Sequence, residues 1–341
     1  MEYPLVSIII VNWNGKHLLG ECLDSLSTQS FKDFEVIVVD NGSEDGSVAY
    51  IRNNYPWARL LSLEENIGYA GGNNAGMRIA QGSFIALLNN DTVVDPCWLE
   101  YLDHAIRTSS PKTGMWASKI LSYGNPEILD NAGLLLYPDG LGRGKGRLEK
   151  DSGQYDQDHE ALFPSGCAGL YRKEMLDQIG LLDETFFAYA DDVSLGLRAR
   201  LAGWECLFVP CAKVYHKYSS SSSAYSTLKA FLVERNRIWV LWKYFPIELI
   251  LMSPFFTAQR FFMHAYAALQ GKGASARFSD QHSFFKGCMI LMKAWWAALR
   301  GLPWVMRERY AFSKHKTLSR WEFYRLLWKF RISAYEVAMK E

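Results

Sequence analysis

The sequence predicts an α/β protein with a doubly wound, mostly parallel sheet, followed by a helical C-terminal extension. Three observations lead to this expectation. Apolar, β-branched runs alternate with segments of helical periodicity in the first part of the chain, which is typical of a parallel sheet covered on both faces. Polar side chains follow several of these runs directly. The last third of the chain has helical periodicity, with aromatic and basic residues interleaved.

The elements of the first part are expected in the order strand, helix, strand, helix, strand, helix, strand. The strands are Leu5–Val11, Phe34–Asp40, Ala58–Leu63 and the run that begins at Ser83. A Gly- and Asn-rich segment at 66–76 is expected to lead into the last of the helices. The sheet would therefore have its ligand crevice at the carboxyl ends of these strands.

The strand that begins at Ser83 ends in Asn89, Asn90 and Asp91. A turn would explain these residues, since Asn and Asp favour turns. However, residues 12–14 and Asp40 also lie at the carboxyl ends of strands, and three polar strand ends at one edge favour a binding site. Asp91 is the candidate ligand of a divalent metal, because Mg²⁺ and Mn²⁺ prefer carboxylate oxygens together with phosphates.

A second group of polar residues lies in the middle of the chain. Asp191 and Asp192 follow an aromatic run at 186–189, which we expect to be a strand, and they open a helix. Helix capping alone would account for one carboxylate, whereas the other is a candidate general base that faces a cleft. His216 ends a later strand and is either a structural residue or a metal ligand.

Several protein classes lack support in the sequence. There is no GxxxxGK[ST] motif and no GxGxxG after the first strand, and HExxH and GxSxG are also absent. The six cysteines form no CxxC pair, so we expect reduced core residues of a cytoplasmic protein. The chain leads directly into its first strand, and we expect no signal peptide.

Charge divides the chain into two parts. Residues 1–224 contain 18 basic and 29 acidic residues, whereas residues 225–341 contain 19 and 7. A serine-rich run marks the expected boundary between two domains. The basic, aromatic second part favours an anionic partner, either membrane or nucleic acid. Its longest charge-free runs, 249–259 and 261–271, are too short for a spanning helix.

The sequence resembles the family 2 glycosyltransferases of the GT-A fold over about residues 4–245. The resemblance rests on six segments in the family's order: VSIIIVNWNG, VIVVDNGSEDGS, ENIGYAGGNNAG, LLNNDTVV, GLLDETFFAYADDVSLGLRARLAGW and VYHK. It is similar above all to the bacterial rhamnosyltransferase-type branch, which builds lipopolysaccharide O-antigen and other surface polysaccharides. The resemblance implies inverting transfer from a nucleotide-diphospho-sugar, with Mg²⁺ or Mn²⁺.

The resemblance also implies a role for each candidate residue. The nucleoside base would be held by Val11, Trp13 and Asp40, and the donor pocket would be lined by Asn66, Gly68 and Asn74. Asn89, Asn90 and Asp91 form the DxD-like element, with Asp91 on the metal and the two asparagines on the donor. His216 would contact metal or phosphate, and Asp192 would be the general base. In the family's Glu-Asp-x-Asp pattern, Asp191 replaces Glu and Ser194 replaces the last Asp.

The expected donor is dTDP-L-rhamnose, with UDP-sugars as the alternative, and the expected acceptor is a glycan or a lipid-linked glycan. The protein would act at the inner face of the cell membrane, bound through the basic C-terminal helices. Their tryptophans are Trp239, Trp242, Trp295, Trp296, Trp304, Trp321 and Trp328. These helices could instead pack on the catalytic domain or form a homodimer. A catalytically weak sugar-nucleotide-binding scaffold subunit is the alternative function, and no nucleic acid partner is expected.

Overall fold

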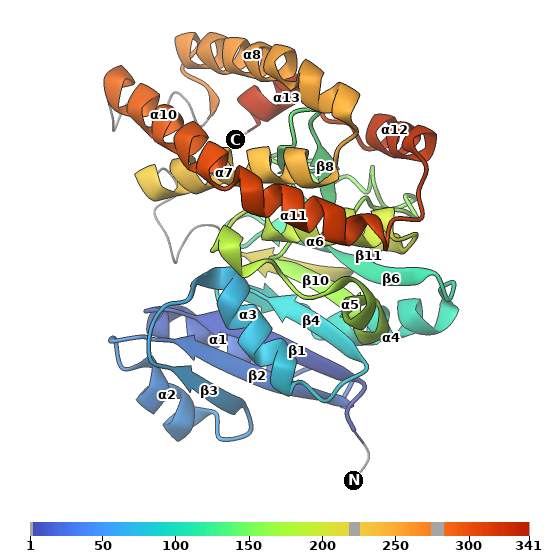
Figure 1. Cartoon of the computed structure of the whole chain (residues 1–341). Helices are drawn as coiled ribbons and strands as arrows, with labels where there is room; N and C mark the ends of the chain where they lie inside the picture. The colour runs from blue at the N-terminus through green and yellow to red at the C-terminus, as the bar shows by residue number, and fades with distance from the viewer. Residues whose placement is uncertain (1–2, 218–225, 274–282, 341) are drawn as a thin grey trace.

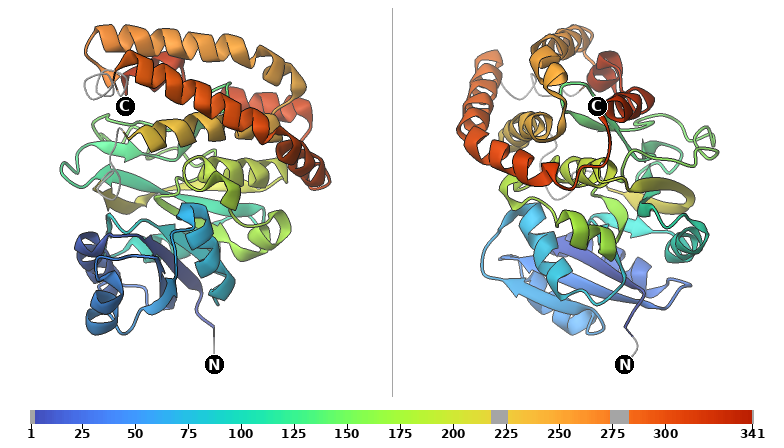
Figure 2. Two further views of the ribbon diagram at one scale, coloured as in Figure 1. Left: turned by 60° about the vertical axis from the view of Figure 1, so that its left-hand side comes forward. Right: turned by 45° about the vertical axis from the view of Figure 1, so that its right-hand side comes forward.

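The computed structural model describes residues 3–217, 226–273 and 283–340. A nine-stranded mixed sheet lies at its centre, and a layer of helices from the C-terminal part of the chain covers one side of it (Figure 1, Figure 2). The predicted boundary at 224/225 lies outside the described residues.

The N-terminal half of the sheet is parallel, as predicted. Its strands are β1 (Val6–Asn12), β2 (Phe34–Asn41), β3 (Arg59–Leu63) and β4 (Phe84–Leu88). They are connected by the helices α1 (Lys16–Ser27), α2 (Ser47–Asn54) and α3 (Gly68–Ile79). Strand β1 pairs with both β2 and β4, so the strand order reverses at β1 and a crevice is expected at its carboxyl end.

Helix α3 begins earlier than the sequence analysis expected. The Gly- and Asn-rich segment is itself helical from Gly68, instead of leading into the helix. Its glycines allow close packing on the sheet, because a Cβ on Gly72 would lie 2.8 Å from a Val11 methyl group and one on Gly76 would lie 2.5 Å from an Ile9 methyl group. This close approach to the sheet compensates for the low helix propensity of glycine.

The second half of the sheet adds antiparallel pairs. Its strands are β5 (Thr92–Val94), β6 (Thr113–Ser122), β7 (Leu129–Asn131), β10 (Ala168–Arg172) and β11 (Glu205–His216), and α4 (Trp98–Thr108) and α5 (Lys173–Ile179) accompany them. Strand β10 is antiparallel to β4 and β6, whereas β11 is parallel to β6. The order is β3-β2-β1-β4-β10-β6-β11-β5, with β7 on β6. Strands β8 (Leu134–Leu136) and β9 (Gly142–Gly144) form a separate hairpin.

The aromatic segment before Asp191 is not the strand that we expected. A short 3₁₀ helix, η1 (Glu184–Phe186), is followed by positive φ angles of 66° at Phe187, 67° at Tyr189 and 61° at Ala190. These left-handed conformations exclude an extended strand. The Asn236 amide stabilises them, because its Nδ2 lies 2.8–3.0 Å from the backbone oxygens of Phe186, Ala188 and Tyr189. The segment therefore turns the chain into helix α6 (Asp191–Leu201).

The C-terminal part is helical, as predicted. Its helices are α7 (Thr227–Tyr244), α8 (Ile247–Leu269), α10 (Phe284–Arg300), α11 (Leu302–Ser313), α12 (Arg320–Lys329) and α13 (Ala334–Met339). Side chains of α7, including Trp239 and Leu241, share one hydrophobic core with β1, α3 and α6. The division into two domains stays a prediction. No helix in the described ranges is long and apolar enough to cross a membrane.

Candidate active site

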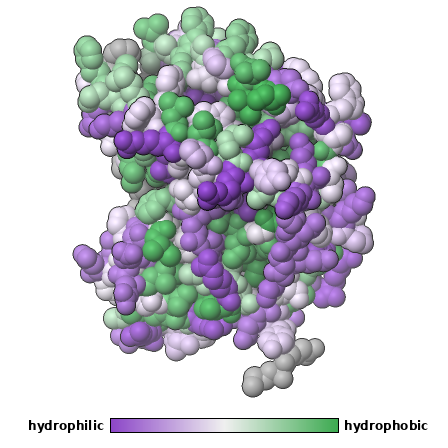
Figure 3. All heavy atoms as spheres, viewed as in Figure 1, coloured by the Kyte–Doolittle hydropathy of each residue, from purple (hydrophilic) through white to green (hydrophobic). Residues whose placement is uncertain are grey.

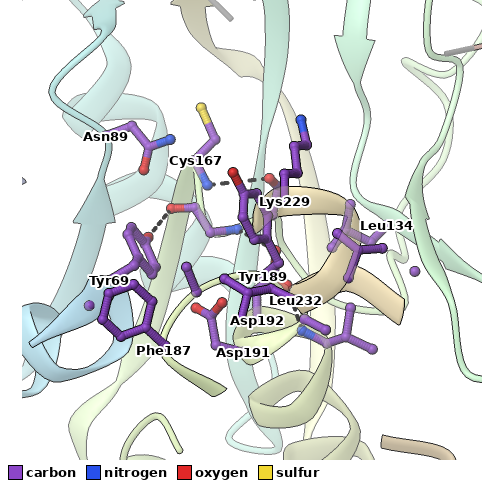
Figure 4. Close-up of a pocket in the computed structure, with 18 of the residues that line it drawn as sticks. Tyr69, Asn89, Leu134, Cys167, Phe187, Tyr189, Asp191, Asp192, Lys229 and Leu232 are labelled. Atoms are coloured by element: carbon purple, nitrogen blue, oxygen red, sulfur yellow. Dashed lines mark hydrogen bonds between the residues drawn. The ribbon is translucent and has the colours of Figure 1, made fainter. Parts of the chain in front are cut away.

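A cavity of about 470 Å³ lies at the carboxyl ends of the parallel strands (Figure 4). Nine of the eleven predicted site residues line it: Val11, Trp13, Asn66, Gly68, Asn89, Asn90, Asp91, Asp192 and His216. Asp40 and Asn74 do not. In Figure 4, Asn89 and Cys167 lie toward one end of the cavity, and Phe187 and Asp191 toward the other.

Asp40 does not line the cavity but is linked through Asn12 to Asn90, which does. Its Oδ1 accepts a hydrogen bond from Asn12 Nδ2 at 3.2 Å, and its Oδ2 accepts one from the Ser43 backbone N–H at 3.1 Å. The Asn12 side-chain oxygen in turn accepts from Asn90 Nδ2 at 2.8 Å. This chain of buried groups joins the ends of β2 and β1 to the β4–β5 turn. Asn12 was expected among the polar residues at the strand ends, but its role as the link between Asp40 and Asn90 comes from the structure.

A second unassigned asparagine, Asn41, shapes the wall beside helix α3. Its Nδ2 donates to Asn66 Oδ1 and to the Gly68 carbonyl, both at 3.0 Å, and its Oδ1 accepts from the Ile67 N–H at 3.1 Å. Gly68 has a φ of +81°, and a Cβ there would lie 2.5 Å from the Phe187 carbonyl oxygen. Glycine is therefore required where α3 meets the aromatic turn.

Asn74 fixes helix α3 to the segment that precedes Asp191. Its Nδ2 donates to the Leu182 carbonyl at 2.8 Å and to Glu184 Oε1 at 2.9 Å, and its Oδ1 accepts from the Leu182 N–H at 3.0 Å. These contacts use both the donor and the acceptor of the Asn74 amide, and Asn74 is not among the residues that line the cavity. The structure therefore places Asn74 as a positioning residue and not in the wall of the pocket.

Asp91 presents a buried carboxylate oxygen to the cavity. The residue is 2% exposed, and its Oδ1 accepts no hydrogen bond from any described residue. This oxygen lies 3.3 Å from His216 Nε2, because β11 pairs with β5 and sets His216 opposite Thr92. A buried charge is costly unless it is paired or binds a cation. The two side chains therefore form a candidate site for a divalent cation.

Asp130 orients the His216 ring. Its Oδ2 lies 2.6 Å from His216 Nδ1, and its Oδ1 accepts from Arg147. Burial lowers the pKa of His216, but the neighbouring Cys167 sulfur and the carboxylates of Asp130 and Asp91 outweigh it and raise that pKa well above its ordinary value. In metal sites, the histidine nitrogen that does not bind the metal commonly donates a hydrogen bond to a carboxylate, which orients the ring. Asp130 comes from β7, and no sequence pattern links it to His216.

The described residues contain no group of three or more His, Cys, Asp or Glu side chains arranged to hold a metal ion. Asp91 and His216 alone would leave most of the coordination sphere of Mg²⁺ or Mn²⁺ open. In nucleotide sites these ions commonly bind one or two carboxylates, with phosphate oxygens and water as the remaining ligands. The pair therefore fits a cation that is bound together with a phosphate-bearing ligand.

Asp191 and Asp192 begin helix α6 and line the cavity together. Asp192 Oδ2 accepts from the Gly166 N–H at 2.9 Å, and its Oδ1 accepts from the Val193 N–H at 2.8 Å. Burial raises the pKa of Asp192, although these two N–H groups oppose the shift. For Asp191, burial and the adjacent Asp192 charge both raise the pKa well above its ordinary value.

Ser194 contacts helix α7. Its Oγ lies 2.7 Å from the Tyr244 hydroxyl, and the residue is fully buried. The side chain at this position, where the related pattern has Asp, therefore bonds the C-terminal extension.

Replacing Asp191 by Asn should stabilise the protein at neutral pH. Folding raises the pKa of Asp191 and so favours its protonated carboxyl group. The free energy of unfolding therefore falls as the pH rises through the pKa of the folded state. An amide that stays neutral avoids this loss, so the Asp191→Asn variant should melt a few degrees higher near pH 7. The difference should shrink in thermal melts at acidic pH, and a difference that is equal at both pH values would contradict this explanation.

The chain belongs to glycosyltransferase family 2, because the family model for Glycosyl transferase family 2 matches residues 7–180. It is 27% identical over 277 residues to N-acetylglucosaminyl-diphospho-decaprenol L-rhamnosyltransferase of Mycobacterium tuberculosis, across 69% of this chain and 86% of that protein. It is 28% identical over 232 residues to the O-antigen biosynthesis protein RfbC of Myxococcus xanthus, across 65% of this chain and 18% of that protein. RfbC and two further relatives are much longer proteins, and the region matched by this chain covers 18–26% of their length.

Two solved structures share the GT-A fold. GalNAc-T7 with UDP, GalNAc and Mn²⁺ matches with a TM-score of 0.59 and 17% identity, over 79% of this chain and 51% of that chain. The mannosyltransferase PcManGT from Pyrobaculum calidifontis, in complex with GDP-Man and Mn²⁺, matches with a TM-score of 0.51 and 16% identity, over 89% and 88%. The predicted fold class and family are thereby confirmed.

Proposed function

We propose that this chain is a metal-dependent, inverting glycosyltransferase of bacterial cell-surface glycan synthesis. The sugar would come from a nucleotide-diphospho-sugar and pass to a glycan or lipid-linked glycan. One observation carries the proposal: a single cavity contains the buried Asp91 oxygen beside His216 and also the carboxylate of Asp192. A glycosyl donor needs charge compensation at its diphosphate, and the acceptor hydroxyl needs a base, so the cavity offers both.

The metal would be Mg²⁺ or Mn²⁺, held by Asp91 Oδ1 and His216 Nε2. When bound, the ion neutralises charge on the diphosphate leaving group. Asn89 and Asn90 lie on the same turn as Asp91 and would orient the donor. The Mn²⁺ in the complexes of GalNAc-T7 and PcManGT supports this proposal.

The nucleoside would lie between β1 and helix α3. Val11 and Trp13 line this part of the cavity, and the indole of Trp13 is 48% exposed and available for stacking on a base. Asn66 and Gly68 would form the adjacent wall. Asp40 would act through Asn12 and would not contact the base. Thymine and uracil both suit this surface, and the rhamnosyltransferase relative favours dTDP-rhamnose as the first donor to test.

Asp192 would act as the general base. It would accept the proton of an acceptor hydroxyl while that oxygen attacks the anomeric carbon from the face opposite the diphosphate. The new carbon–oxygen bond forms as the bond to the diphosphate breaks, and its electron pair leaves with the diphosphate, which inverts the anomeric configuration. The N–H groups of Gly166 and Val193 hold the carboxylate in place, and its raised pKa makes it a stronger base.

The acceptor would enter on the side lined by the β8–β9 hairpin and the first turns of α7. This side combines cationic and apolar side chains, including Arg143, Lys229, Leu228 and Leu232. Such a lining suits an acceptor that carries phosphate and lipid next to its sugar. The M. tuberculosis relative, whose name describes a diphospho-decaprenol-linked sugar, supports an acceptor of this class.

The rate of transfer should fall at acidic pH. Protonated Asp192 cannot accept a proton, and its pKa is raised above the ordinary 3.8 of aspartate. A plot of log kcat against pH should therefore show an acidic limb with its inflection above the ordinary aspartate value. A rate that stays flat down to about pH 4, where an ordinary aspartate protonates, would contradict Asp192 as the base.

A thermal-shift screen of dTDP-, UDP- and GDP-sugars, each with Mn²⁺ and with EDTA, tests the proposed function. We expect one nucleotide class to raise the melting temperature only when Mn²⁺ is present. Each stabilising donor is then assayed for release of its nucleoside diphosphate. Metal-dependent binding without release in the presence of candidate lipid-linked acceptors would instead favour a scaffold subunit.

A further inference from the structure

Helix α10 carries its large apolar side chains on its outer face. Five of them recur at alternating spacings of four and three: Phe285, Met289, Met292, Trp296 and Leu299. This spacing places them in one stripe, and they are 50–80% exposed. The opposite face contains Ala294 and Ala298, which are fully buried. The helix therefore reverses the usual pattern, in which the apolar stripe faces the core.

Helix α8 shows the same reversal. Its outer stripe consists of Leu251, Phe255, Phe262, Tyr266 and Leu269, which are 44–87% exposed. Its inner face contains Arg260, which donates to Asp139 Oδ2 at 2.8 Å and to Glu234 Oε2 at 3.0 Å. An arginine on the inside and phenylalanines on the outside suit a helix whose outer face meets an apolar partner. Figure 3 shows apolar side chains gathered over this end of the molecule.

Basic residues accompany the stripe of α10. Lys286, Lys293 and Arg300 each follow a stripe residue directly and recur every seven positions, so they form a second stripe beside the first. Lys293 and Arg300 are exposed, and α10 contains no acidic residue. Helix α8 contains a single acidic residue, Glu248, in its first turn. Each helix therefore presents an exposed apolar stripe, and the stripe of α10 has a positive border.

We propose that the outer stripes of α8 and α10 form a membrane-binding face that lies on an anionic lipid bilayer. Interfacial helices place aromatic and aliphatic side chains in the headgroup layer and keep basic residues at the lipid phosphates. We infer the surface from exposure and charge. That the bilayer is the inner leaflet of the cell membrane rests on the proposed function. Helix α7 packs against α10, with Trp239 Nε1 donating to the Ala298 carbonyl at 3.2 Å, and its first turns line the cavity.

The seven tryptophans of the C-terminal helices divide into two groups by exposure. Trp239 is 5% exposed and packs edge-to-face on Trp304 at 5.2 Å, and Trp242 and Trp304 both pack against the core. Trp295, Trp296, Trp321 and Trp328 are 44–69% exposed. Periodicity alone cannot separate the two groups, since both lie on helices with mixed faces.

Charge favours a bilayer over a second copy of the chain. In a two-fold symmetric dimer the same patch meets itself, so two basic stripes of α10 would lie close together without acidic partners on either helix face. Like charges opposed in an interface are unfavourable. An anionic lipid surface instead complements them, and the excess of 19 basic over 7 acidic residues in 225–341 has the same sign.

The test is co-sedimentation of the full chain with vesicles of phosphatidylglycerol and phosphatidylcholine in equal parts, and with phosphatidylcholine alone. We expect binding to the anionic vesicles that weakens with salt, and little binding to the neutral ones. The triple variant Met289→Gln, Met292→Gln, Trp296→Gln should bind about 100-fold more weakly, because three apolar side chains no longer enter the headgroup layer. Lys293→Glu should weaken binding roughly fivefold or more, since one basic residue is replaced by an acid.

The matched control replaces three exposed aromatic residues far from these helices: Tyr3→Gln, Trp57→Gln and Tyr101→Gln. This control should bind vesicles as the unaltered chain does. The rise in melting temperature on adding the donor shows whether each variant is folded and binds the donor, independently of lipid binding. The membrane face is refuted if the unaltered chain ignores anionic vesicles or if the triple variant binds equally well. A dimer in sedimentation that the triple variant converts to monomer, without vesicle binding, would assign the face to a second copy.

Discussion

Asp192→Asn should lower kcat by about 10³-fold while leaving donor affinity nearly unchanged. The amide keeps the shape of the side chain and its single oxygen can accept from one of the two N–H groups of Gly166 and Val193, but it cannot accept a proton. The loss therefore falls on the transition state and not on the bound donor. Steady-state kinetics give kcat, and calorimetric titration of the donor in the presence of Mn²⁺ gives the affinity.

Asp191→Asn is the matched control for this experiment, because it is the adjacent acid at the start of the same helix. Asp191 is 3% exposed and Asp192 is the more accessible of the two, so the control should retain much more activity. Near-normal turnover in Asp192→Asn together with an inactive Asp191→Asn would show that the general base is Asp191. A parallel loss of donor affinity would show that Asp192 acts in binding.

Asp91→Ala should abolish metal-dependent donor binding, with a loss of about 100-fold or more in affinity. The Asp91 oxygen is the proposed carboxylate ligand beside His216, and without it the charge of the diphosphate would not be compensated by a cation. Calorimetry of the donor with Mn²⁺ and with EDTA measures the effect. Equal affinity with and without Mn²⁺ in the unaltered chain would count directly against the metal.

Two comparisons separate this effect from misfolding. Asp91→Ala removes the contact of Oδ1 with His216 Nε2 at 3.3 Å but also removes a costly buried carboxylate. We expect the two effects to offset, so that the melting temperature of the ligand-free protein changes little. Asp130→Asn should weaken Mn²⁺-dependent binding by about 10- to 100-fold, because it loosens the His216 ring without removing a ligand. An Asp130→Asn effect larger than that of Asp91→Ala would mean that His216, and not Asp91, dominates the site.

The parallel half of the sheet could be predicted because its strands are buried on both faces. Val6–Asn12 alternates its side chains between two hydrophobic cores, so Ile8 and Ile10 enter one and Ile9 the other. Such strands read as continuous apolar runs. An apolar run does not show whether a strand is parallel or antiparallel to its neighbours. Strand β10 lies between β4 and β6 and is antiparallel to both, and this arrangement depends on long-range pairing.

The candidate site could be predicted where its residues lie next to strand ends or begin helices. Asp91 lies in the turn after β4, His216 ends β11, and Asp192 lies in the first turn of α6. Residues that act through another side chain were missed. Asp130 comes from β7, and its partner His216 is 86 positions away. The turn before Asp191 owes its left-handed backbone to Asn236 of α7, and local sequence favours a strand there. These features come from tertiary contacts, which no local pattern records.

The most direct test of the central claim is release of nucleoside diphosphate by the purified chain from dTDP-rhamnose and UDP-sugars, with a lipid-linked acceptor present. The proposed site predicts release that requires Mn²⁺ or Mg²⁺, disappears in EDTA, and is lost in both Asp91→Ala and Asp192→Asn. Release that proceeds equally in EDTA, or that survives both substitutions, would contradict it.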